Sequence, residues 1–142
     1  MGALSDARAA AVLNRLFNGA TLTIPATYYI ALSTTQPEDD GTNVTEPSGG
    51  TAAGYARKAV TVNTTNFPTT SGRSISNGVA ITFANPAAGD DWGVIGWFAL
   101  YDASTAGTFH GWGAFGDSIA VDDTQTGPVI PAGALVIYAP GS

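Results

Sequence analysis

The feature that most constrains the fold is a series of short segments in which side-chain polarity alternates or apolar residues cluster. Tyr28, Ile30 and Leu32 alternate with smaller or more polar neighbours, and Val79, Ile81 and Phe83 do the same. A period of two is typical of strands with one buried face. Segment 93–101, GVIGWFALY, is apolar on both faces and predicts a central strand. Segment 108–115 pairs aromatic residues with glycines, which indicates a strand against closely approaching backbone. Strands are expected at 28–33, 60–63, 79–83, 93–101, 108–115 and 134–139.

These short strands are separated by turns rich in Gly, Pro, Asn and Asp, and no internal repeat is visible. The pattern predicts a mainly β fold, an antiparallel β-sandwich or barrel-like (jelly-roll-like) domain with one short N-terminal amphipathic helix. A length of 142 residues fits one domain. We expect an N-terminal helical segment at 1–19 and a single β domain at 20–142.

The helix is expected at residues 5–18. Ser5 suits the N-cap and Gly19 suits a left-handed C-terminal cap. Five apolar residues follow the spacing of one helical face: Ala9, Val12, Leu13, Leu16 and Phe17. A helix this short is marginal alone, so it must dock. The sequence leaves open whether it docks on its own β core or reaches a neighbouring subunit or partner.

Two polar stretches, 34–54 and 64–76, are expected to be loops without strands. The first is unusually long for a compact domain, and such loops are often functional. In an assembly, both loops are natural segments for reaching a neighbour.

Composition removes several classes of function. Eleven acidic and five basic residues give a net charge of −6, which argues against a general nucleic-acid binder. The absence of cysteine excludes disulfides, thiolate metal sites and cysteine nucleophiles. No apolar run is long enough to predict a transmembrane helix, and the start lacks the regions of a signal peptide. No nucleic-acid or membrane partner is therefore expected.

Residues that carry chemistry are few. His110 is the only histidine, and no G-x-S-x-G elbow accompanies it, so a structural role is favoured over catalysis. Acid pairs at 39–40, 90–91 and 122–123 could in principle hydrolyse glycosides or bind calcium, but each lies in a turn-like context. No catalytic, cofactor-binding or metal-binding residue is expected, and no cofactor.

The basic and aromatic residues are candidates for surfaces that contact another protein or a sugar. Arg57, Lys58 and Arg73 are the only bases after residue 15, and they could meet acidic loops of a neighbouring copy or lie on a solvated strand edge. The three tryptophans are expected mostly in the core, although an exposed one could serve an interface or a sugar-binding face: Trp92, Trp97 and Trp112.

Four segments occur in a characteristic order. They are FNGATLTIPATYYIALSTTQP at 17–37, EPSGGTAAGYARKAV at 46–60, SISNGVAITFANPAAGDDWGVIGWFALYDASTAGTFHGWGAF at 74–115, and IPAGALVIY at 130–138. This set resembles a family of small virion proteins of tailed bacteriophages, over nearly the whole chain. The TAA at 51–53, between SGG and GYAR, departs from the family's pattern.

The resemblance implies a non-enzymatic virion structural protein on the exterior of the phage head or tail. We expect an exterior capsid decoration or cement protein that binds and stabilises the head shell. The alternative is a tail fibre or tail-tip component, for which a host receptor or a glycan would be the ligand. A separate carbohydrate-binding module, stacking sugars on a tryptophan, is a third reading.

Close-packed β subunits of low charge suit a homo-oligomer, for which a trimer is expected. The other expected partners are the major capsid protein or tail proteins of the same virion. Contacts are expected from the helix face and the 34–54 loop, with these residues as candidates: Val12, Leu13, Leu16, Phe17, Asp39, Asp40, Tyr55 and Arg57.

Overall fold

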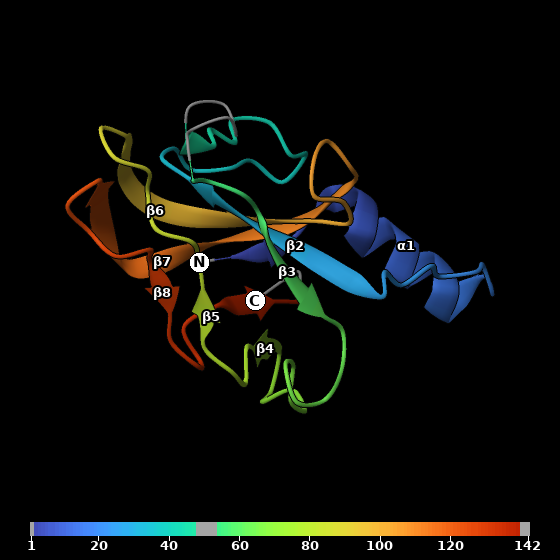
Figure 1. Ribbon diagram of the computed structural model, residues 1–142. Helices are drawn as coiled ribbons and strands as arrows, with labels where there is room; N and C mark the ends of the chain where they lie inside the picture. The colour runs from blue at the N-terminus through green and yellow to red at the C-terminus, as the bar shows by residue number, and fades with distance from the viewer. Residues whose placement is uncertain (1, 48–53, 140–142) are drawn as a thin grey trace.

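The computed structural model describes residues 2–47 and 54–139, and it is dominated by a curled seven-stranded sheet, a half-barrel (Figure 1). The strand order is β3-β2-β6-β7-β1-β9-β4, and neighbours pair antiparallel except β1 and β9. The strands of this sheet are β1 (Ala3–Leu4), β2 (Thr27–Ser33), β3 (Lys58–Thr61), β4 (Ser74–Ser76), β6 (Asp91–Tyr101), β7 (Phe109–Asp122) and β9 (Val136–Tyr138). A second sheet pairs β5 (Ile81–Thr82) with β8 (Val129–Ile130). The expected mainly β class is confirmed.

The β6–β7 hairpin forms the middle of the large sheet. Strand β6 has 11 residues and β7 has 14, the longest strands described. Their register shifts at three points, and such irregularities increase local twist and bend a strand. The sheet can therefore curl around its own core instead of remaining flat. The central strand expected at 93–101 is confirmed, and the strand expected at 108–115 continues to residue 122.

The core lies inside the curl. Its largest fully buried apolar side chains are Ile30, Leu32, Trp92, Ile95, Phe98, Val121 and Leu135. The second half of β2 is buried on both faces, although its sequence predicts one wet face. Ser33 is covered because its hydroxyl bonds the loop that follows, accepting from Thr45 N at 3.0 Å and donating to Thr35 O at 2.7 Å. Thr35 and Thr45 of this loop therefore cover the end of β2.

The helix α1 (Asp6–Phe17) forms where the sequence predicts it. Ser5 Oγ accepts from Arg8 N at 3.2 Å, which confirms the N-cap, and Gly19 takes a φ of +73°. None of its residues is buried, and it leaves the sheet as a projection (Figure 1). Its first half is partly covered, with Ala9 and Val12 half-buried, whereas Leu13, Leu16 and Phe17 are exposed, so only part of the apolar face packs on the β domain. No helix of the described part is long and apolar enough to cross a membrane.

Several boundaries differ from the sequence prediction. Of the strand expected at 79–83, only Ile81–Thr82 is a strand, although Phe83 N also donates to Pro128 O, just before β8. The expected loop 64–76 ends in strand β4, because those residues hydrogen-bond to β9. The described residues of 34–54 form no strand, as expected, whereas 48–53, with the TAA at 51–53, lie outside the described residues. The division at residue 19 stays a prediction, with β1 contributing to the sheet from the first segment.

Glycine positions β1 on β7. A Cβ on Gly111 would lie 2.6 Å from the carbonyl oxygen of Ala3, whereas one on Gly116, in the same strand, would meet nothing within 4 Å. Gly111→Ala should therefore force β1 outward and lower the free energy of unfolding by about 1–3 kcal/mol. Gly116→Ala, the matched control, should leave it unchanged or raise it by up to about 1 kcal/mol. Urea denaturation of both variants measures this, and equal stabilities would contradict the close approach.

Candidate interaction surfaces

The most exposed apolar surface is the second half of α1. Leu13 is 56% exposed, Leu16 69% and Phe17 83%, while Val12 is half-buried. The helix is held at its start, where Ser5 N donates to His110 O at 2.9 Å and Asp6 N donates to Asp39 O at 3.0 Å. The structure therefore brings the four predicted helix residues together on a helix anchored at one end. Their role as contacts stays a prediction.

The two predicted aspartates of the loop lie close to the start of this helix. Asp39 Oδ1 accepts from the indole Nε1 of Trp112 at 2.7 Å, so its side chain ties the loop to β7. Asp40 is exposed, and its Oδ1 accepts from the hydroxyl and the backbone N–H of Thr42. These two hydrogen bonds lower the pKa of Asp40. Asp40 is thus an exposed carboxylate in a tight turn, whereas Asp39 is engaged within the chain.

Tyr55 and Arg57, the other two predicted contact residues, lie together in an internal polar cluster. The guanidinium of Arg57 forms an ion pair with Glu46, with Nη2 2.6 Å from Oε1. Both side chains are largely buried, at 8% and 13% exposed. The Nη1 of Arg57 donates to Ala103 O and Ala106 O, and its Cζ lies 3.7 Å from the ring centroid of Tyr101.

The Tyr55 hydroxyl donates to Glu46 Oε2 at 2.7 Å and accepts from Leu32 N at 3.1 Å. The partner of Arg57 is therefore an acid of its own chain, not of a neighbouring copy. Sequence reasoning missed Glu46, although it is the acid that opens the EPSGG segment before the YAR segment. The Tyr55 hydroxyl and the Arg57 guanidinium are both hydrogen-bonded within the chain. A contact of either residue with another protein stays a prediction.

His110 is buried next to a shallow groove. Its Nε2 lies 3.4 Å from Asp102 Oδ2, its ring packs edge-on to Tyr28, and its Nδ1 has no partner among the described residues. The backbone N–H of Thr108 holds Asp102 Oδ1 at 2.7 Å and lowers the pKa of that carboxyl. No hydroxyl of the described residues hydrogen-bonds the imidazole, so no nucleophile–base pair is assembled here.

The remaining acid pairs lie where strands end: Asp91 opens β6 and Asp122 closes β7, and Asp90 and Asp123 lie just outside these strands. Asp91 and Asp122 cap Gly93 and Thr124, and Asp123 accepts from Gly89 N. Asp90 accepts from Trp92 Nε1. Among the described residues, no group of three or more His, Asp or Glu side chains could hold a metal ion.

The tryptophans give little support to a sugar-stacking face. Trp92 and Trp112 are buried, with their indole nitrogens bonded to Asp90 and Asp39, and only Trp97 is half-buried. An aromatic platform for a sugar needs an open ring face, which the two buried tryptophans do not offer.

An apolar groove of about 240 Å³ lies between the far half of β7 and β8. Its lining includes Ile95, Phe115, Ile119, Val129 and Pro131, with the exposed Asp117 beside them. Nothing in the sequence pattern predicts it, because its walls come from four strands: β2, β6, β7 and β8. Figure 1 shows β8 and α1 on opposite sides of the molecule.

Comparison with known proteins gives one finding about family. The profile described as podophage GP4 fiber I protein gp80 matches residues 3–138, which include every helix and strand described above. No curated protein matches the sequence.

The buried Arg57–Glu46 pair generates a stability prediction. Arg57→Lys keeps the charge but loses the forked geometry, so the free energy of unfolding should fall by about 2–3 kcal/mol. Lys58→Arg, the reverse exchange at the neighbouring exposed residue, should change it by less than about 0.5 kcal/mol. Guanidinium denaturation compares the two. If Arg57→Lys proves as stable as Lys58→Arg, the cluster contributes no such stabilisation.

A second prediction concerns alkaline pH. Burial, together with the nearby Glu46 carboxylate, raises the pKa of Tyr55 above its ordinary value. Because an unfolded tyrosine ionises near about pH 10, the unfolded state loses a proton there that the folded state keeps. The stabilisation is fully present below that pH and should be lost above it by up to about 1.4 kcal/mol per pH unit.

Urea unfolding from pH 8 to 11 should therefore show a shallower alkaline loss of stability in Tyr55→Phe than in the wild type. Below about pH 9 the two proteins should show the same pH dependence, because tyrosine is protonated in both states there. Identical slopes above pH 10 would contradict the assignment.

Proposed function

The chain belongs to the podophage GP4 fiber I protein gp80 family, and from this membership we propose that it is a component of a phage tail fibre. The match over residues 3–138 is the observation that carries the proposal, since it spans the whole described fold and not one motif. Family membership makes the chain a bacteriophage virion structural protein. The family description favours the tail-fibre alternative over the capsid decoration that the sequence analysis put first, for which no support was found.

The structure supports a role through surface contact and not through a reaction. In the described part of the chain, the imidazole of His110 is buried against Asp102, and the acid pairs bond local backbone and side chains. The family is one of structural fibre proteins, which suggests a non-enzymatic role. By contrast, α1 presents bare apolar side chains to solvent, which in soluble proteins marks a surface used for association.

The sequence pattern bears on which part of a fibre this chain would form. Neither a heptad seam nor a repeated shaft motif is present in the sequence, so the chain is proposed as a compact knob or attachment unit. Its proposed partners are other tail proteins of the same virion and further copies of itself, on the exterior of the particle.

Immunogold electron microscopy of intact virions tests this proposal. Antibody raised against the purified protein should place gold at the tail, with an antibody against the major capsid protein as the control that labels heads. Gold spread at many copies over the heads would overturn the tail-fibre proposal and support capsid decoration.

A further inference from the structure

Two apolar features of this chain lack a partner within the described residues. One is the end of α1, where Leu16 and Phe17 project into solvent. The other is the apolar groove between β7 and β8, whose rim residues Ile119 and Val129 are also exposed. Its volume of about 240 Å³ lies below the roughly 300–1,000 Å³ typical of small-molecule sites and suits one or two inserted side chains.

The two features cannot meet within one molecule. Helix α1 starts beside His110 of β7, whereas the groove extends from Phe115 to Ile119 along the same strand. At about 3.3 Å per strand residue, the groove lies roughly 17–30 Å from the start of the helix. The helix, about 18 Å long, runs in the other direction (Figure 1). A rigid helix held at its start cannot fold back, so the helix tip cannot fill the groove of its own copy.

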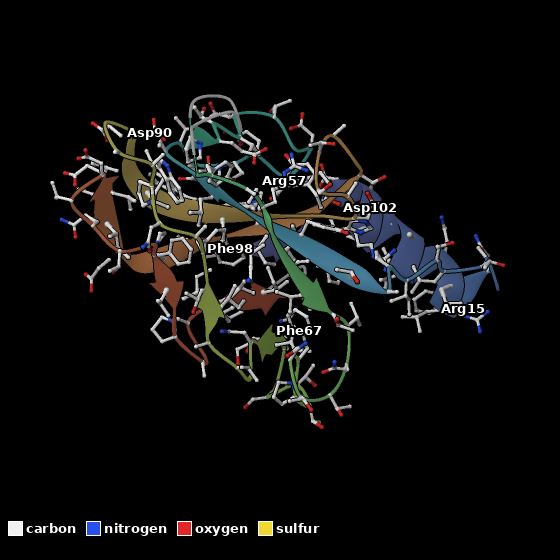
Figure 2. All side chains as sticks on the ribbon, viewed as in Figure 1. Arg15, Arg57, Phe67, Asp90, Phe98 and Asp102 are labelled. Carbon is white, nitrogen blue, oxygen red and sulfur yellow. The ribbon has the colours of Figure 1, made fainter. Side chains whose placement is uncertain are left out.

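Charge favours a second copy of this chain as that molecule. Arg15 precedes Leu16 on α1; it is exposed, and its guanidinium makes no hydrogen bond or ion pair with the described residues. The groove carries the exposed Asp117, and the hairpin end beyond it holds the acid pairs 90–91 and 122–123. Figure 2 shows Arg15 and Asp90 at opposite ends of the molecule. Thus a basic apolar tip at one end faces an acidic apolar groove at the other.

We propose that copies of this chain associate head to tail, with Leu16 and Phe17 of one copy inserted into the β7–β8 groove of the next and Arg15 next to Asp117. Such a contact is heterologous: it uses two different surfaces, and it forms a ring if the rotation between copies closes. The trimer expected from the sequence is one such ring. The interface does not depend on the position of the protein in the virion, so it stands or fails separately from the tail-fibre proposal.

The test measures the mass of the purified protein across a concentration series by sedimentation velocity. Phe17→Ser and Ile119→Lys should each lower the association constant by roughly thirtyfold or more, as expected for a central anchor of an interface. Val79→Lys is the matched control, because Val79 is 46% exposed, Ile119 is 43% exposed, and Val79 lies in neither feature. It should associate like the wild type. All three positions are exposed, and circular dichroism checks that each variant is folded.

A mixing experiment distinguishes head-to-tail association from pairing of helix with helix. Phe17→Ser keeps its groove and Ile119→Lys keeps its helix, so an equimolar mixture retains one intact contact and should form 1:1 dimers that extend no further. The charge reversals Arg15→Glu and Asp117→Arg should each weaken association, and the double variant should recover it. A monomeric wild type, an Ile119→Lys variant that still associates, or a mixture that stays monomeric would each overturn the proposal.

Discussion

The close approach of backbone to the glycines of β7 is the constraint on which the rest of the structure depends. Gly111 leaves room for the carbonyl of Ala3, and Gly113 leaves room for the ring of Phe98, which a Cβ would meet at 2.4 Å. On one side β7 thus accepts the most buried aromatic ring of β6, and on the other it accepts β1. Because α1 follows β1 after a single capping residue, these contacts also set where the helix leaves the body.

The second constraint is electrostatic. A chain with few charges places one of its five basic residues, Arg57, in a largely buried pair with Glu46. The pair connects the loop before β3 to the turn between β6 and β7, and the Tyr55 hydroxyl extends it to the backbone of β2. Removing one partner of such a pair leaves a buried charge unpaired, so the pair holds Glu46 and Arg57 against the turn between β6 and β7. Other acids lie at the open end of the β6–β7 hairpin, where Asp91 and Asp123 are exposed.

The elements that could be predicted from the sequence are those determined by residues close together in the chain. The helix is bounded by Ser5 and Gly19, whose effects are local, and β6 is long enough for its apolar run to be unambiguous. Strands β1 and β8 have two residues each, so they carry no periodicity, and they exist only through partners distant along the chain. The same reason hid both candidate sites. Glu46 and Tyr101 meet around Arg57 only in the folded protein, and the walls of the apolar groove likewise come together only there. Amphipathicity predicted an apolar face on α1, but not that Leu13, Leu16 and Phe17 of that face stay exposed.

The way the sheet ends bears on how the protein can assemble. Its edge strands, β3 and β4, have only four and three residues, and β3 carries the exposed Lys58. Short edges with a lysine disfavour strand addition between copies, which would otherwise be the simplest contact for an open sheet. In the head-to-tail association proposed above, insertion of the α1 side chains into the groove of the next copy replaces strand pairing at these short edges and defines the register between copies. For a fibre component this matters, because a heterologous contact that closes yields a discrete unit, whereas pairing of open edges has no such limit.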